Sequence, residues 1–186
     1  GVGHPARSGL DDAQATAGLA SGRLDAGSAV AVVDKLDNDV RFAVTVGDVD
    51  PDAEASIAAI GASFVRCDVT DSSDVVRAIE VASGPEGLQI LVNNAGIFPT
   101  TGPMLEATDE FVARMLDVNV RAQFSVSREA AKRMTGGGAI VNLASIMGFS
   151  GGLFPNPAYQ ASKGAVVNLT RALALEFAPF NITVNA

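Results

Sequence analysis

Short apolar runs alternate with longer amphipathic segments along most of the chain. Two runs, Leu88–Val92 and Ala139–Leu143, are apolar except for one residue each, which is typical of strands buried on both faces of a sheet. Shorter runs of the same character also predict strands, at Ala29–Val33, Phe42–Val46, Ser63–Arg66 and Ile182–Val184. A polar cluster at 35–39 indicates a turn between the first two of these.

Capping signals mark the predicted helices between these strands. Asp71 or Ser72 is placed to cap a helix that runs to about Ala82. Thr108 begins a long helix, with acidic residues in its first turn, that continues to about Met134. A further helix carries Tyr159 and ends near Pro179. Weaker patterns predict short helices at Asp11–Ala17 and Asp52–Ile60.

This alternation predicts a three-layer α/β/α, Rossmann-like fold with a mostly parallel sheet. The regular pattern begins near residue 44, so residues 44–186 are predicted to form one dinucleotide-binding and catalytic domain. Residues 1–43 match poorly and are interpreted as loop or as a degenerate first β-α unit. In such sheets ligands bind beyond the carboxyl ends of the strands. Many polar candidates follow strand ends: Asp48, Asp68, Asn93, Asn94, Gly96 and Ser145.

Composition excludes several other functions. The 186-residue chain has 13 basic and 21 acidic side chains, and its net charge of −8 argues against nucleic acid or an anionic membrane surface as partner. No apolar run is long enough to span a membrane. The single histidine, His4, excludes a histidine-based triad, and no Cys/His cluster predicts a metal site. The single cysteine, Cys67, is expected in the core and favours a reducing, cytoplasmic setting.

The strongest chemical signal is Tyr159-Gln160-Ala161-Ser162-Lys163. Tyr159 and Lys163 are four residues apart, so a helix places them on one face. An ammonium group near a phenol favours the phenolate form, which suits the tyrosine to proton transfer. The spacing alone occurs by chance on many helices, so its meaning depends on the rest of the chain.

Four motifs together resemble the short-chain dehydrogenase/reductase family. They occur in the family's order and with about its intervals: Asn93-Asn94-Ala95-Gly96, Asn119 in Leu116-Asp117-Val118-Asn119-Val120, Ser145 in Asn142-Leu143-Ala144-Ser145, and Tyr159-x-x-x-Lys163. The chain resembles a fragment of that family with an altered N-terminus and without the C-terminal tail.

The resemblance implies a nicotinamide-dependent oxidoreductase that acts on a secondary alcohol or ketone. Tyr159 is then the acid/base, and Lys163 favours its phenolate and binds the nicotinamide ribose. Ser145 orients the substrate oxygen, and Asn119 holds a water that links Lys163 to solvent. Homo-oligomers formed through the helices at 109–134 and 157–178 are also implied.

Cofactor positions follow from the same resemblance. Asp48 is expected to bind the adenosine ribose, and its carboxylate disfavours a 2′-phosphate, so NAD is predicted over NADP. Asp68 and Val69 are expected at the adenine edge. The segment Asn93, Asn94, Ala95 and Gly96 is expected beside the adenosine ribose, where small residues allow close approach.

Simpler interpretations stay open for several of these residues. Asp48 can be a turn residue, and Asp68 can cap the next helix. The alanines at 158, 161, 165 and 172 suit either the core or a subunit interface. Phe98, Met147 and Phe149, with Leu153 and Phe154, suit either an apolar entrance to the site or loop packing.

One expected part of the family pattern is absent from the sequence. The glycine-rich loop Thr-Gly-x-x-x-Gly-x-Gly, which holds the cofactor's diphosphate at a helix N-terminus, is not found. Its nearest remnant is Gly18-Leu19-Ala20-Ser21-Gly22. This supports an alternative hypothesis, a non-catalytic remnant of the same fold that binds cofactor weakly. A sugar-nucleotide-modifying relative of the extended type is a third, weaker hypothesis.

Overall fold

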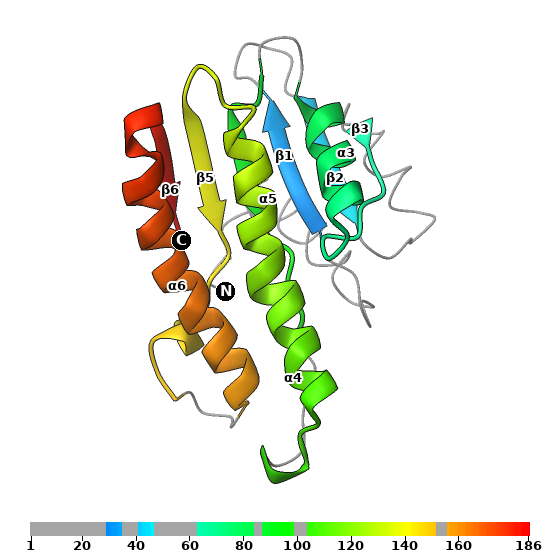
Figure 1. Ribbon diagram of the computed structural model, residues 1–186, viewed down its shortest axis with the longest axis vertical. Coiled ribbons are helices and arrows are strands. Elements are labelled where there is room, and N and C mark those ends of the chain that lie inside the picture. Colours follow the sequence, from blue (N-terminus) through cyan, green and yellow to red (C-terminus); the bar gives the residue numbers. More distant parts are fainter. Residues whose placement is uncertain (1–28, 35–40, 47–62, 84–86, 99–103, 152–155) are drawn as a thin grey trace, which may run out of the picture.

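The computed structural model describes residues 29–34, 41–46, 63–83, 87–98, 104–151 and 156–186 (Figure 1). In these ranges six strands form one sheet, in the order β3-β2-β1-β4-β5-β6. The strands are β1 (Ala29–Asp34), β2 (Arg41–Val46), β3 (Ser63–Phe64), β4 (Ile90–Asn93), β5 (Gly138–Asn142) and β6 (Ile182–Asn185). All six predicted strands are confirmed, with ends shifted by one or two residues.

The direction of β1 departs from the rest of the sheet. β2 and β3 pair in parallel, as do β4, β5 and β6, whereas β1 is antiparallel to both β2 and β4. Five strands therefore run one way and β1 runs the other; the arrows of β1 and β5 point in opposite directions in Figure 1. The predicted mostly parallel sheet is confirmed, but with a reversed strand at its centre. Only six residues separate β1 from β2, too few for a crossover to a parallel strand.

One layer of helices of the described chain covers one face of the sheet (Figure 1). The helices are α3 (Ser72–Ala82), α4 (Asp109–Leu116), α5 (Ala122–Ala131) and α6 (Pro157–Phe177), with shorter helical turns η1 (Met104–Glu106), η2 (Asp117–Arg121), η3 (Ile146–Gly148) and η4 (Ala178–Phe180). Figure 1 shows α3, α5 and α6 side by side across this face.

Three of the four described α-helices, α3, α4 and α6, begin at a side-chain cap. The carboxylate of Asp71 accepts hydrogen bonds from the backbone N–H groups of Ser73 and Asp74, so the predicted cap of α3 is Asp71 rather than Ser72. Thr108 caps α4, as predicted. Asn156 caps α6, and Pro157 occupies its first turn, where the missing N–H costs nothing. Asn156-Pro157 therefore sets where the helix with Tyr159 begins.

The predicted continuous helix from Thr108 to Met134 is wrong in one respect. A π-helical turn, η2, separates α4 from α5, and α5 ends at Ala131. Each hydrogen-bonded ring of a π-helical turn contains one more residue than a ring of an α-helix. Such turns often occur at functional sites. Asn119 lies inside η2.

The core lies between this helical layer and the sheet. Alternate residues of the strands face the helices and are buried, as in Leu91 and Asn93 of β4 and Ile140 and Asn142 of β5. They pack against small and branched residues of α3 and α5, including Val75, Ile79, Val126 and Ala130. Cys67 is buried here as expected, and burial raises the pKa of its thiol to about 12. The predicted helices at 11–17 and 52–60 lie outside the described residues.

Candidate active site

Parallel strands bring the predicted site residues to one edge of the sheet. Asp68 follows β3, Asn94 and Gly96 follow β4, and Ser145 follows β5. The amino-terminal half of α6, which carries Tyr159 and Lys163, contacts η3 at the same edge. Asp48, which follows β2, lies outside the described residues.

Lys163 is a buried cation without an anionic partner. It is 5% exposed, and its Nζ donates one hydrogen bond, 2.6 Å long, to the carbonyl of Leu143. No carboxylate among the described residues forms an ion pair with it, and burial lowers the pKa of its ammonium group. An ammonium has three donors, so Lys163 keeps capacity for further acceptors.

Gly96 leaves space beside this ammonium group. A Cβ built on Gly96 would lie 3.5 Å from Lys163 Nζ and 3.4 Å from Asn119 Oδ1. A side chain at position 96 would therefore occupy the space next to the two polar groups. A small residue here fits a site where a ligand's hydroxyl groups approach Lys163.

Asn119 ties the loop after β4 to α6. It is fully buried; its Oδ1 accepts a hydrogen bond from the Ile97 N–H at 2.7 Å, and its Nδ2 lies 3.0 Å from both the Ile97 carbonyl and Ser162 Oγ. Ser162 Oγ in turn donates to the Tyr159 carbonyl. The side chain of Asn119 is thus committed to holding the site together. The predicted water at Asn119 would have to use its backbone.

Tyr159 lies between the ammonium group and an exposed aromatic ring. Lys163 Nζ is 5.7 Å from the centroid of its ring, on the next turn of α6. The Phe98 ring packs edge-on against it, with centroids 4.5 Å apart. Phe98 is half-exposed, so it forms an apolar wall beside the phenol. Of the predicted apolar entrance, Phe149 is also exposed, and Leu153 and Phe154 lie outside the described residues.

Ser145 caps the start of η3, and this turn lies against α6 through a close backbone contact at Gly148. The Ser145 Oγ accepts a hydrogen bond from the Met147 N–H at 3.2 Å. Its hydroxyl proton has no acceptor among the described residues, so it can donate to a bound oxygen. A Cβ on Gly148 would lie 2.7 Å from the Lys163 carbonyl oxygen. Glycine at 148 therefore lets η3 dock on the helix that carries Tyr159 and Lys163.

Asp68 and Val69 occupy the loop that leads into α3. Asp68 Oδ1 accepts hydrogen bonds from the backbone N–H and the hydroxyl of Thr70, at 2.8 and 2.7 Å. The alternative that Asp68 caps α3 is wrong, since Asp71 does so. Asp68 Oδ2 receives no hydrogen bond from the described residues. The Val69 side chain is buried in the core, which leaves only its backbone for a ligand.

Asn93 turns away from the edge and into the core. Its Nδ2 donates to Ser127 Oγ and to Asn142 Oδ1, both at 2.8 Å, and Asn142 Nδ2 donates to Thr170 Oγ1. This buried chain of hydrogen bonds joins α5, β4, β5 and α6. The side chain of Asn93 thus fixes the strands from which Asn94 and Ser145 project.

One buried amide of α5, that of Gln123, forms no hydrogen bond with the described residues. The side chain of Gln123 is 1% exposed, and neither Nε2 nor Oε1 has a hydrogen-bond partner among the described residues. Gln123 lies one helical turn from Asn119 and one from Ser127, both of which are hydrogen-bonded. Its burial costs stability, because a buried amide without partners loses its bonds to water.

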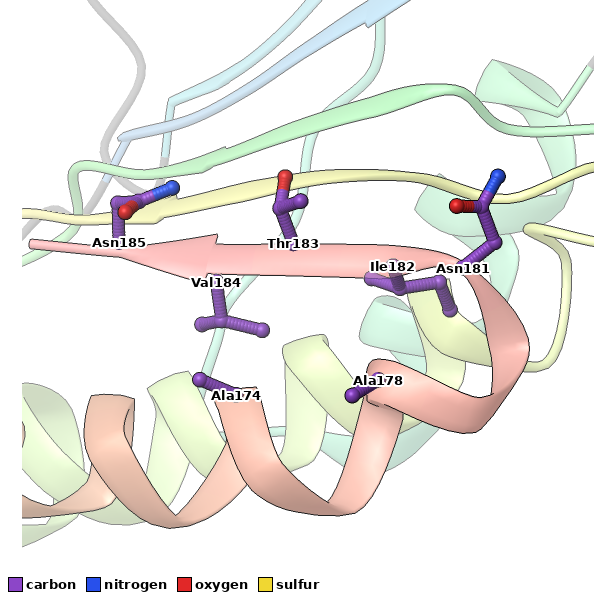
Figure 2. Close-up of a pocket in the computed structure, with 7 residues that line it drawn as sticks. All are labelled: Ala174, Ala178, Asn181, Ile182, Thr183, Val184 and Asn185. Atoms are coloured by element: carbon purple, nitrogen blue, oxygen red, sulfur yellow. The ribbon is translucent and has the colours of Figure 1, made fainter.

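A pocket between the end of α6 and β6 lies apart from the site. Its lining is apolar and polar: Ala174, Ala178, Asn181, Ile182, Thr183, Val184 and Asn185 (Figure 2). It contains none of the predicted catalytic residues. Among the described residues no group of three or more His, Cys, Asp or Glu could hold a metal ion, and no helix there could cross a membrane.

Sequence reasoning missed several residues that shape the site. Ser162 lies within the Tyr159–Lys163 motif, but the motif alone indicates no role for it. Gly148 gave a signal only as part of a glycine-rich loop. No sequence pattern indicates that Asn142 and Ser127 bind Asn93, because the partner of a buried polar residue depends on which strands and helices meet.

Known proteins with similar sequences identify the family of this chain. The family model described as "Enoyl-(Acyl carrier protein) reductase" matches residues 27–186. A galactitol 2-dehydrogenase from Rhizobium johnstonii is 38% identical over 166 residues, covering 87% of this chain and 61% of its own length. The chain belongs to the short-chain dehydrogenase/reductase family. A cyclopentanol dehydrogenase from Comamonas sp. is 40% identical over 67% of the chain and 50% of its own length.

Solved structures of family members support the fold. A short-chain dehydrogenase/reductase from Mycobacterium marinum superposes with a TM-score of 0.70 at 36% identity, over 77% of this chain and 61% of that one. A short-chain dehydrogenase from Burkholderia cenocepacia, in complex with NADP, gives a TM-score of 0.71 at 35% identity, over 77% and 60%. The chain thus spans about three-fifths of the length of these relatives, and belongs to a family of NAD(P)-dependent oxidoreductases.

Proposed function

We propose that this protein transfers hydride between a nicotinamide cofactor and a secondary alcohol or ketone. The observation that carries the proposal is the buried ammonium of Lys163, which has no carboxylate partner among the described residues and lies one helical turn from Tyr159 and beside Gly96. A buried charge without an anionic partner is costly, so a ligand's hydroxyl groups are its natural acceptors. A purely structural helix would place an apolar residue there.

The predicted chemistry assigns one task to each residue. A bound nicotinamide supplies or accepts the hydride. Tyr159 passes a proton to or from the substrate oxygen, and the ammonium of Lys163 favours its phenolate. Ser145 donates its free hydroxyl proton to the same oxygen and orients it. Asn119 holds the loop after β4 against α6 through its hydrogen bonds to Ile97 and Ser162.

The apolar wall at Phe98 favours a substrate with an apolar body. Phe98 packs on Tyr159, and Ile146 and Phe149, which follow Ser145 in the η3 region, are exposed. The named relatives act on galactitol and cyclopentanol, both of which carry secondary hydroxyl groups. Asp48 supports NAD over NADP from the sequence alone, although neighbouring structures include an NADP complex.

Oligomers through α4, α5 and α6 form part of the proposal. Leu116 and Phe124 are exposed on the α4–α5 segment, and Leu175 on α6. Among the alanines at 158, 161, 165 and 172, none is buried, so they do not belong to the core of the described chain. An interface is the interpretation that they still support.

The proposal is tested by following nicotinamide absorbance with a panel of secondary alcohols and ketones. Turnover that falls by about 10²- to 10⁴-fold in Tyr159→Phe supports it. Full activity in Tyr159→Phe would refute the assignment of the acid/base. A Phe98→Ala variant serves as a control, because it should change KM for bulky substrates more than kcat.

The second candidate is a non-catalytic remnant of the same fold. The reversed β1 favours it, because the strand that normally leads to the diphosphate loop runs the other way. A clear rise in melting temperature with added NAD counts against this candidate.

A further inference from the structure

The reversed strand changes one part of the cofactor site and leaves others in place. In dinucleotide-binding sheets with this strand order, the diphosphate binds where the central strand ends and a glycine-rich loop leads into a helix N-terminus. Here the carboxyl end of β1 pairs, through Asp34, with Arg41 at the amino end of β2. It therefore lies at the edge opposite Asn94 and Ser145. A diphosphate loop cannot follow β1 at the edge where Lys163 lies.

The connection after β1 is also too short to supply the missing part. Six residues join Asp34 to Arg41, and an antiparallel hairpin forms across them. A helix that started at the active edge would need a crossover of a dozen or more residues. The sequence agrees, since it lacks the glycine-rich pattern.

The N-termini of the described helices offer no alternative binding site for the diphosphate. The N-termini of α3, α4 and α6 are capped by the side chains of Asp71, Thr108 and Asn156, and α5 continues directly from η2. The cap of α3 is itself a carboxylate, and Asp68 and Asp74 lie beside it. A dianion approaching this edge therefore meets negative charge, in a chain whose net charge is −8.

The two ends of the cofactor still have matching groups. Lys163 and the space at Gly96 suit the hydroxyl groups of a ribose, and Asp68 keeps an open carboxylate oxygen for a base amine. We infer that this chain recognises the two nucleoside halves of the cofactor, one at Lys163 and the other at Asp68, by contacts to sugar and base alone, and that the diphosphate contributes no net affinity. The inference rests on the proposed function, because it concerns the same site.

The experiment compares adenosine with ADP by isothermal titration of the whole 186-residue chain, at low and at high salt. We expect dissociation constants within about threefold of each other. We also expect ADP to bind more tightly as salt is added, because salt screens the repulsion by the acidic edge. ADP binding that is more than about tenfold tighter than adenosine, and that weakens with salt, would overturn the inference.

A matched variant shows whether both ligands use the predicted edge. At high salt, where the repulsion between the acidic edge and the diphosphate is screened, Asp68→Ala should weaken adenosine and ADP by the same factor, since each presents the same base. An ADP affinity that the variant leaves unchanged, or no saturable binding of adenosine to the wild-type chain, also overturns the inference. Failure of the proposed function is separate: it is a lack of Tyr159-dependent turnover while adenosine still binds.

Discussion

The sheet divides into two halves that follow the family pattern to different degrees. β4, β5 and β6 run in parallel, and their carboxyl ends gather Gly96, Ser145 and the start of α6. On the other side, β1 and β2 form an antiparallel hairpin, although the strand order is the usual one. The residues that would move protons and the strand that would lead to the diphosphate therefore depend on separate parts of the chain.

The difference shows that strand order and strand direction carry different information. Order places β1 beside β4, where its backbone completes the sheet. Direction decides which end of the strand lies at the edge of the sheet that carries Asn94, Gly96 and Ser145. It therefore decides where a loop and helix can bind a phosphate. A sheet can therefore keep its proton-transfer residues while losing its anion site.

The largest predicted effect separates function from stability in the parallel half. Lys163→Met should reduce turnover by about 10²- to 10⁴-fold. It should not lower the melting temperature, because it replaces a buried ammonium, whose pKa is already lowered by burial, with an apolar chain. Turnover and thermal unfolding measured on both proteins check this.

The same group gives a pH dependence with a defined sign. The folded-state pKa of Lys163 is below that of the unfolded chain, so the unfolded state binds the proton more tightly. Stability of the wild type relative to Lys163→Met should therefore rise as pH increases from the folded pKa toward about 10. A difference that stays constant over this range would contradict the buried, unpaired ammonium.

The next effect tests the contact between η3 and α6. Gly148→Ala places a Cβ 2.7 Å from the Lys163 carbonyl oxygen, so it should destabilise the fold by about 1–3 kcal/mol and lower turnover. Gly151→Ala is the control, because nothing lies within 4 Å of a Cβ there. Equal melting temperatures for the two variants would show that the close contact is not formed.

A core substitution of similar size tests the hydrogen bonds that join β4 to β5. Asn93→Leu removes a buried donor shared by Ser127 and Asn142, and should cost about 1–3 kcal/mol. Urea unfolding measures the change in free energy. Wild-type stability in this variant would mean that the parallel half does not depend on the network.

The smallest effect has the opposite sign. Gln123→Leu replaces a buried amide without partners, and should be neutral or stabilising by about 1 kcal/mol. The pair Asn93→Leu and Gln123→Leu thus compares a bonded with an unbonded amide, in adjacent parts of one core. A loss of more than about 1 kcal/mol in Gln123→Leu would show that its amide has partners in solution.

Sequence patterns predicted the elements well because periodicity and caps are local. Asp71 and Thr108 cap the helices as expected, and the apolar runs became β4 and β5. The motifs also predicted which residues reach the active edge. The placement of Lys163 beside Gly96 supports that prediction, and the roles of these residues stay predictions.

Features that depend on long-range contacts could not be predicted. The pairing of β1 with β4 joins segments far apart in the sequence, so no local pattern indicates it, although the short connection to β2 already requires an antiparallel hairpin. The π turn at Asn119 depends on contacts with Ile97 and Ser162. The buried role of Asn93 likewise depends on Ser127 and Asn142, and a strand-end asparagine gives no sign of it.

The direction of β1 is tested most directly by nuclear Overhauser effects between the α-protons of β1 and β4. The observed register pairs Ala31 with Val92, Val32 with Leu91 and Val33 with Ile90. An antiparallel pairing brings alternate α-carbons within about 4.5 Å, so strong contacts between facing α-protons should appear at alternate pairs of this register. Parallel pairing of β1 with β4, seen as the absence of those contacts, would contradict the account.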